Sequence, residues 1–394
     1  MSLEARSRIG VVSEGFIYLD NAGAGPLPVD TVESVKRFVD QWFRSGEPWI
    51  EGLEAVESSK KLFADLVKVS PDEIAATPGL TYGLNSLLSS LDLDGTRDII
   101  VSDANFPTSI YTAHSMKRAG LVRNVIIARV LASRDPDESI EKLINDRTAL
   151  VLIDHVSWIS GYRFDIRRIV DKAHRHGALV AIDGFHAVGV IPVDLRKLDV
   201  DFYLTGSYKW LMSLHGAGFV YVRRDLIDRL NPKFSGWFSV EDSPIKRLKT
   251  IGREMFKKPF DIERLGLARD ASILEWGTGS LVSFAALESS LRFLLRYNAP
   301  EYFETHTRVI LKKLYEELSS TGYNIVTPDN IPSGILVFRV RDSYEIADRL
   351  SKNKIVVSPR PGVIRVSPHF YNTREEIEIL VEELKSIDSH GRIL

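Results

Sequence analysis

The sequence predicts an α/β protein: a mostly parallel sheet with helices on both faces, plus a smaller α+β domain towards the C-terminus. Apolar β-branched runs alternate with helical patterns from about residue 74 to residue 223. Strands that alternate with helices imply crossover connections and a mostly parallel sheet. The chain has 394 residues, of which 44% are hydrophobic. That is enough for one large and one smaller core, so we expect two domains.

Five segments of the alternating region are the clearest strands: Asp98–Ser102, Ala149–Asp154, Ala178–Asp183, Asp201–Thr205 and Gly218–Val222. Between them, Ile166–His176 predicts an amphipathic helix, because its apolar residues recur at helical spacing. The turn at Thr77–Gly83 leads into an apolar helix that we place at Leu84–Leu91.

The pattern changes after a loop-rich stretch around residues 231–265. We expect helices at Ser283–Tyr297 and Pro300–Thr321, short strands at Gly334–Arg339, Ile355–Ser358 and Val363–Ser367, and a final helix opened by Asn372-Thr373-Arg374-Glu375. The predicted large domain is 19–265. The predicted small domain combines 1–18 with 266–394, including a connecting helix.

Composition excludes several classes of protein. The formal net charge is −2, from 51 basic and 53 acidic residues, which argues against nucleic acid or an anionic membrane surface as the main partner. No apolar run approaches the roughly 18 residues that span a bilayer, and Met1–Gly10 lacks the apolar stretch of a secretory signal. There are 0 cysteines, so disulfides, zinc–thiolate sites and thiol nucleophiles are excluded. We expect a cytoplasmic protein without a metal site.

The central candidate site pairs Asp183, in Ala181-Ile182-Asp183-Gly184-Phe185-His186, with Lys209, in Thr205-Gly206-Ser207-Tyr208-Lys209-Trp210. Each follows a predicted strand, and ligands of open parallel sheets bind beyond the carboxyl ends of strands. A carboxylate there can pair with a protonated ring nitrogen, and an amine of lowered pKa can form a Schiff base. Alternatively, Asp183 caps a helix and Lys209 is solvated.

A phosphate site is predicted where Thr77-Pro78-Gly79-Leu80-Thr81-Tyr82-Gly83 leads into the helix, because free N–H groups and the helix dipole attract anions. It is not a P-loop, since no Gly-Lys-Ser/Thr follows. HExxH and Gly-x-Ser-x-Gly motifs are missing, and Gly23-Ala24-Gly25-Pro26-Leu27-Pro28 is no dinucleotide fingerprint, because Pro28 stands where the third glycine should fall.

Other residues carry weaker signals. Phe106 could stack on a planar ring, and His186 could donate to a ring hydroxyl, although both could be ordinary core. Arg365 suits carboxylate recognition, although a surface salt bridge is the simpler interpretation. Four further residues are possible pocket walls: Trp49, His155, Trp158 and Trp237.

Taken in order, these segments resemble the class V aminotransferase family of fold-type I enzymes that use pyridoxal 5′-phosphate (PLP). That family also contains cysteine desulfurases, isopenicillin N epimerase-like proteins and kynureninase-like enzymes. The resemblance runs from Tyr18-Leu19-Asp20-Asn21-Ala22 to Ser367-Pro368-His369-Phe370-Tyr371-Asn372-Thr373. It implies a seven-stranded-type sheet in the large domain.

Carried over residue by residue, the resemblance implies that Lys209 binds PLP as a Schiff base and that Asp183 pairs with the pyridinium nitrogen. His186 would lie near the phenolic oxygen, and Phe106 would stack on the ring. Leu80, Thr81 and Tyr208 would contact the phosphate, as would Thr278 from the partner subunit, which implies a homodimer with shared sites. Arg365 would bind the substrate α-carboxylate.

Two departures limit the reaction. Trp158 replaces an asparagine that desulfurases place near the ring, and a persulfide mechanism needs a cysteine that this chain lacks. Phe106, His186 and the Ser367–Thr373 segment look closest to the epimerase-like branch. We expect an enzyme acting at Cα of an amino acid, by preference an aminotransferase. An epimerase, a desulfurase-like β-lyase without a persulfide cysteine, and a non-enzymatic scaffold remain as alternatives.

Overall fold

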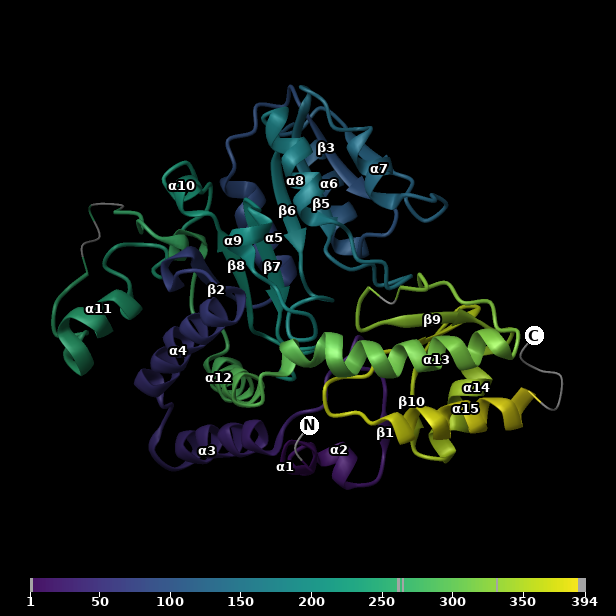
Figure 1. Ribbon diagram of the computed structural model, residues 1–394. Helices are drawn as coiled ribbons and strands as arrows, with labels where there is room; N and C mark the ends of the chain where they lie inside the picture. Colours follow the sequence, from purple (N-terminus) through teal and green to yellow (C-terminus); the bar gives the residue numbers. More distant parts are fainter. Residues whose placement is uncertain (1–2, 261–262, 264–265, 331, 389–394) are drawn as a thin grey trace.

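The computed structural model describes residues 3–260, 263, 266–330 and 332–388. Its centre is a seven-stranded sheet of order β2-β8-β7-β6-β5-β3-β4 (Figure 1). The strands are β2 (Ile74–Thr77), β3 (Asp98–Ser102), β4 (Val125–Ala128), β5 (Thr148–Asp154), β6 (Leu179–Asp183), β7 (Phe202–Gly206) and β8 (Gly218–Val222). Only β8 runs antiparallel to its neighbours, β2 and β7. The predicted α/β fold with a mostly parallel sheet is confirmed.

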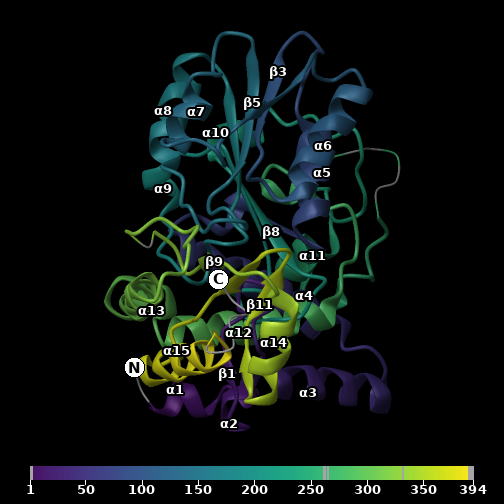
Figure 2. The ribbon, with the colours of Figure 1, turned by 90° about the vertical axis from the view of Figure 1, so that its right-hand side faces the viewer.

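Helices cover both faces of this sheet because its buried strands are apolar on both sides. In β5, Leu150 and Leu152 belong to one core, whereas Val151 and Ile153 belong to another. Successive side chains of a strand point to opposite faces of the sheet, so each face of β5 packs against a different core. Figure 2 shows α5 (Leu80–Ser90) and α6 (Pro107–Arg118) on one side and α8 (Ile166–Arg175) and α9 (Leu195–Leu198) on the other. The short α7 (Pro136–Glu141) precedes β5, and α10 (Arg224–Ile227) follows β8.

A second, smaller sheet is formed by the C-terminal part of the chain. It has the order β11-β12-β9 and is antiparallel. Its strands are β9 (Leu336–Arg339), β11 (Ser358–Arg360) and β12 (Val363–Val366), and its helices are α13 (Arg308–Ser320), α14 (Ser343–Lys352) and α15 (Arg374–Asp388). Leu336, Phe338, Ile364 and Val366 pack in a third core with these helices, whereas Val337 and Val363 pack against the large core. One face of the small sheet is therefore turned towards the large part of the chain.

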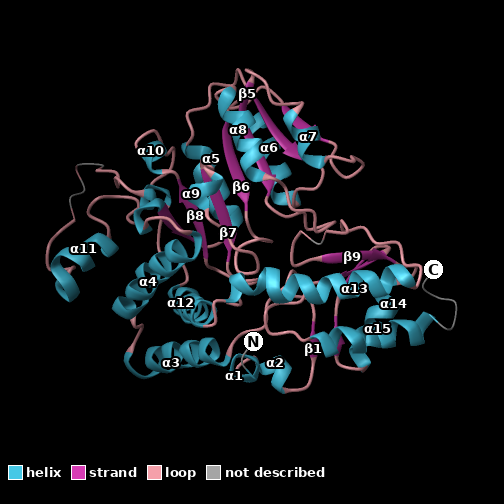
Figure 3. Ribbon diagram, in the orientation of Figure 1, coloured by secondary structure: helices cyan, strands magenta, loops and turns pink. Residues whose placement is uncertain are grey.

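The N-terminal residues return to this C-terminal part. After α1 (Leu3–Ser7) and α2 (Gly10–Ser13), β1 (Ile17–Tyr18) pairs in parallel with β10 (Ile355–Val356). The main-chain N–H of Ser367 donates to the carbonyl of Leu19 at 2.7 Å. This pairing supports the predicted grouping of 1–18 with the C-terminal segment, and Figure 3 shows β1 among the C-terminal helices. The domain limits stay a prediction, and the boundary at residue 265 and the chain ends 1–2 and 389–394 lie outside the described residues.

Helices α3 (Val29–Ser45), α4 (Trp49–Val67) and α12 (Leu281–Arg296) pack together at the base of the large sheet. Helix α11 (Pro244–Ile251) lies within the loop-rich stretch. None of the helices in the described part of the chain combines the length and apolar character needed to span a membrane.

Three predicted elements need correction. The helix expected at Leu84–Leu91 begins at Leu80, because Gly79, with a φ of 153°, turns the chain directly into it. The helix expected over 300–321 is continuous but not uniform: a π-helical turn at Phe303–Thr307 leads directly into α13. The expected strand Ile355–Ser358 is two strands, because the chain leaves β1 after Val356 and joins β12 at Ser358.

Candidate active site

Asp183 and Lys209 lie together at the carboxyl ends of neighbouring strands. Asp183 is the last residue of β6, and Lys209 follows β7, its parallel neighbour. Both are buried, at 5% and 8% exposure. The Lys209 Nζ is 4.3 Å from the ring centroid of Phe185, whose main-chain N–H donates to Asp183 Oδ1 at 2.9 Å. Phe185 therefore contacts both the amine of Lys209 and the carboxyl of Asp183.

Burial and mutual attraction set the charge of this pair. Burial lowers the pKa of Lys209 to about 8, although Asp183 opposes the shift. Burial raises the pKa of Asp183 to about 6, although the Phe185 N–H and Lys209 oppose that shift. Each group therefore titrates closer to neutrality than its ordinary value, as groups that exchange protons in enzymes do.

His186 forms the direct polar contact of the Lys209 amine. The distance from Lys209 Nζ to His186 Nε2 is 3.0 Å. Burial, with Lys209 and Arg365 nearby, lowers the pKa of His186 well below its ordinary value, so the imidazole is neutral. Its Nε2 can accept a hydrogen bond from the ammonium, while Nδ1 has no partner among the described residues. The predicted site residue His186 is therefore in hydrogen-bond contact with the amine of Lys209.

A pocket of about 410 Å³ is lined by Asp183, although its lining residues do not include Lys209 or His186. Four of the predicted site residues besides Asp183 line it: Leu80, Thr81, Phe106 and Tyr208. Leu80 and Thr81 are the first residues of α5, whose first-turn N–H groups lack helical partners and suit an anion. The Thr81 hydroxyl is 3.3 Å from that of Thr108, which also lines the pocket.

Part of the pocket lining is aromatic. Tyr208 stacks on His215, with ring centroids 3.8 Å apart and an interplanar angle of 17°. His215 and Gly216 line the pocket as well, and sequence reasoning missed both. Phe106, at 40% exposure, meets the predicted pocket-wall residue Trp158 edge-to-face at 5.6 Å.

The loop that carries Phe106 is held by an acid that sequence reasoning also missed. The main-chain N–H of Phe106 donates to Asp154 Oδ2 at 2.8 Å. Asp154 ends β5 just as Asp183 ends β6, so the signal that singled out Asp183, an acid at the end of a buried strand, applied to both.

Arg365 lies on β12 and is 2% exposed, so the simpler interpretation as a surface salt bridge is wrong. Its Nη2 donates to Asp20 Oδ1 at 3.2 Å and Ser358 Oγ at 3.3 Å, while Nε is buried without a hydrogen bond to the described residues. Ser358 faces Arg365 across the strand pair, and Arg360 is two residues further, so both arginines share one face. Val337, opposite Arg365 on β9, packs against the large core. The arginines therefore face the large part of the chain, and both lower the pKa of Lys209.

Other predicted residues lie elsewhere. Thr278 is exposed between Leu274 and α12 and does not line this pocket. His155 is buried, with Nδ1 2.9 Å from the Tyr203 hydroxyl, and burial lowers its pKa to about 3. Trp49 and Trp237 pack on each other at 5.9 Å and do not line the pocket.

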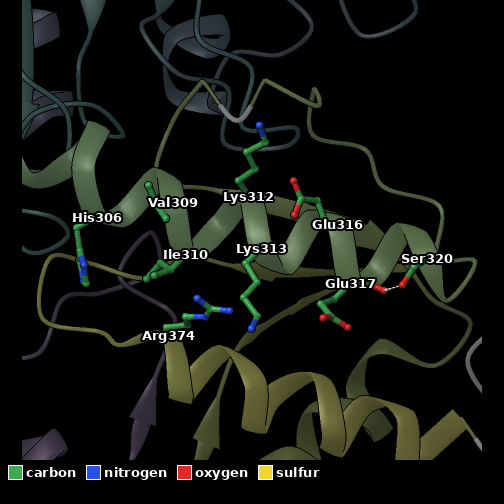
Figure 4. Close-up of a pocket in the computed structure, with 9 residues that line it drawn as sticks. All are labelled: His306, Val309, Ile310, Lys312, Lys313, Glu316, Glu317, Ser320 and Arg374. Carbon is green, nitrogen blue, oxygen red and sulfur yellow. Dashed lines mark hydrogen bonds between the residues drawn. The ribbon is translucent and has the colours of Figure 1, made fainter.

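A wider groove of about 770 Å³ lies between α13 and α15 (Figure 4). Its lining is amphipathic, and Lys313 and Arg374 are both paired with Glu378. The candidate site residues do not line this groove, so the smaller pocket is the candidate active site.

Comparison with known proteins identifies the family. The family model of class V aminotransferases matches residues 17–380, so the chain belongs to that family of PLP-dependent enzymes. Among curated relatives, the uncharacterized aminotransferase YcbU of Bacillus subtilis is 30% identical, covering 91% of this chain and 90% of YcbU. Kynureninase of Bacillus anthracis is also 30% identical, covering 95% of this chain and 89% of the relative.

Solved structures agree on the fold. A C-DES mutant with glycine covalently linked to its PLP cofactor has a TM-score of 0.84 and 21% identity, covering 96% of this chain and 98% of that one. The cysteine desulfurase CsdA of Escherichia coli has a TM-score of 0.81 and 20% identity, with 97% of each chain covered. The predicted resemblance and the enzyme class are confirmed by the family model and the curated relatives.

Proposed function

We propose that this chain acts at the Cα of an amino acid with PLP bound covalently to Lys209, and that its reaction is transamination. The observation that carries the proposal is the buried amine of Lys209 beside the buried carboxyl of Asp183, at adjoining strand ends. A pKa of about 8 makes this amine partly unprotonated near neutrality, as attack on an aldehyde requires.

The residues present fit PLP. Asp183 would pair with the ring nitrogen, and Phe106 would lie against the ring. The start of α5, at Leu80 and Thr81, would bind the phosphate together with Tyr208. The buried Nδ1 of His186, which has no partner among the residues that the structure describes, is a polar atom left for a bound group. When bound, PLP supplies an electron sink for the charge left at Cα.

The chain's own residues would then hold the substrate and move its proton. Arg365 would bind the α-carboxylate through its Nε, which has no hydrogen-bond partner among the described residues, and Arg360 adds a second positive charge on the same face of the small sheet. The amine of Lys209 would take the proton from Cα. Its neutral neighbour His186 can hold the amine in place without competing for positive charge.

A homodimer belongs to the same proposal. Thr278 is exposed in the single chain and does not line the pocket, as a residue that serves a neighbouring subunit would be. Thr278 would complete the phosphate site of the partner. Sedimentation of the holoenzyme should therefore give twice the chain mass, and Thr278→Ala should weaken cofactor binding without changing that mass.

Lyase and epimerase reactions are the second candidates. The kynureninase relatives favour a β-lyase, since they match nearly the whole chain. A lyase working through a protein persulfide is excluded, because the chain has 0 cysteines. All of these reactions begin with loss of a group from Cα, so they need the same lysine, aspartate and arginine.

The test begins with the cofactor. Chain reconstituted with PLP should show the visible absorbance of a lysine-bound cofactor, and borohydride reduction followed by peptide mass spectrometry should place the label on Lys209. Lys209→Ala should lose both the band and turnover. Full activity in that variant would overturn the proposal.

The reaction type is then measured directly. Individual amino acids are screened for formation of the keto acid, of the opposite epimer, or of alanine and sulfide. Keto-acid formation coupled to amination of a second keto acid is the expected result. Alanine release without a keto acid would replace the aminotransferase by the lyase.

A further inference from the structure

Two buried acids stand side by side at the candidate active site. Asp154 and Asp183 are register partners at the ends of parallel strands β5 and β6. Register partners point to the same face of a sheet, and adjacent strands lie about 4.8 Å apart. Both side chains are buried, at 2% and 5% exposure. Two carboxylates cannot both ionise cheaply at such a site.

Their hydrogen bonds differ, and so does the cost of charging them. Asp154 Oδ2 accepts the N–H of Phe106, but Asp154 Oδ1 is buried without a partner among the described residues. Burial and the charge of Asp183 raise the pKa of Asp154 well above its ordinary value. The charged groups that act on Asp154 are Asp183 from β6 and Lys209 from the segment after β7. Asp183 has the N–H of Phe185 and the attraction of Lys209 in its favour, so it is the acid that ionises first.

We propose that Asp154 is a positioning residue that stays protonated in the working enzyme and anchors the backbone of Phe106 through Oδ2. Because Asp154 is neutral, Asp183 is left as the single anion for the ring nitrogen. Because Oδ2 holds Phe106, the aromatic ring stays over the pocket. This inference rests on the proposed function, since it assigns Asp183 and Phe106 to a bound cofactor.

The substitution Asp154→Asn separates this role from that of a charged residue. An amide is neutral, as a protonated acid is, and its oxygen can still accept from Phe106. The variant should bind PLP with nearly unchanged affinity, and the pH dependence of its cofactor absorbance should match the wild type. Asp154→Ala removes the acceptor and should raise the dissociation constant of PLP by about tenfold or more.

The matched control is Asp137, a buried acid outside the site. Its Oδ1 accepts the N–H of Asp165 at 3.0 Å, and its Oδ2 accepts the Tyr162 hydroxyl at 2.6 Å. Whatever their effect on stability, Asp137→Asn and Asp137→Ala should leave the affinity for PLP and the absorbance profile unchanged. Circular dichroism of every variant checks that it is folded.

Two results would overturn the role of Asp154. A pH profile of Asp154→Asn that moves to lower pH by about one pH unit would mean that a negative charge had been removed beside Asp183. Unchanged PLP affinity in a folded Asp154→Ala variant would mean that the anchor has no effect on the pocket. Failure of the proposed function is separate, because it would appear as loss of the Lys209 label in the wild type.

Discussion

The amine of Lys209 lies 3.0 Å from Nε2 of His186, and both side chains are buried. The imidazole is neutral, so its lone pair stabilises the ammonium form of Lys209 where solvent cannot. His186 is followed by Ala187, whose main-chain N–H donates to the carbonyl of Gly184, which folds the segment after Asp183 into a tight turn. The turn that ends β6 therefore holds the carboxyl and the acceptor of the amine together.

His186→Gln should preserve much of this contact, because an amide oxygen can still accept from Lys209. His186→Leu removes the contact that holds the amine in position. Although this change favours the unprotonated amine, the loss of positioning should lower the rate of covalent PLP binding and kcat/KM by about 10- to 100-fold. Stopped-flow absorbance of PLP addition to the apoenzyme measures the first quantity. Equal rates in the leucine variant and the wild type would contradict the contact.

Lys209→Met should stabilise the apoenzyme while it removes covalent cofactor binding. The folded pKa of Lys209 is about 8, below the ordinary value of 10.5, so folding is penalised by burial of an ammonium. The penalty is complete below about pH 8, and the stability it costs returns as pH rises towards 10.5. Its size is on the order of 3 kcal/mol. Urea unfolding of the apoenzyme against pH measures it, and the methionine variant should lack the alkaline rise.

Lys60 is a control for which the expected change in stability has the opposite sign. Burial alone would lower the pKa of Lys60, but Glu275, at 2.9 Å, and Glu57 raise it above its ordinary value. Lys60→Met would leave Glu275 buried without its cation and should therefore destabilise the fold. If both methionine variants changed stability in the same direction, the electrostatic account of Lys209 would be wrong.

Arg365→Gln should raise KM for amino acids by about 100-fold or more while leaving PLP binding intact, because a charge-assisted pair with the carboxylate is lost. An amine of the same side chain that lacks the carboxylate gives the matched comparison. Its slow reaction should be equally slow in the wild type and the variant. If the variant lost activity equally towards both compounds, the role of Arg365 would instead be structural, through its contact with Asp20.

Gly184→Ala should displace the segment that follows Asp183. A Cβ at Gly184 would lie 2.0 Å from Cε1 of Tyr203. The Tyr203 ring is fully buried, so it cannot move aside freely. The variant should lose about 1–3 kcal/mol of unfolding free energy and weaken PLP binding, because Asp183 must shift. Gly10→Ala is the control, since a Cβ there meets nothing within 4 Å. Thermal unfolding of the two apoenzymes compares them.

The fold was largely predictable because its signal is local. Strand patterns such as Ala178–Asp183 differ from β6 by a single residue at one end. The short β4 (Val125–Ala128) was missed, because four residues at a sheet edge give little periodicity. The π-helical turn at Phe303–Thr307 was not predicted, because it has no sequence pattern distinct from an α-helix.

The site was predictable where order along the chain stands for order in space. Asp183 and Lys209 follow consecutive parallel strands, so their meeting could be inferred. Asp154 also ends a buried strand, but no reactive residue such as Lys209 was recognised after the next strand, so Asp154 was not singled out. Arg360 was missed because its position depends on the pairing of β11 with β12. The predicted role of Thr278 in a partner subunit stays a prediction.

The pairing of β1 with β10 has a consequence for biosynthesis. Asp183 ends β6 and Lys209 follows β7, in a sheet whose last strand ends at Val222, whereas Arg365 lies on β12. On the ribosome, where early segments fold first, the amine and its carboxyl can meet while the N-terminal residues still await their partners. Arg365, which we propose binds the substrate carboxylate, is thus among the last of the candidate site residues to be synthesised and folded.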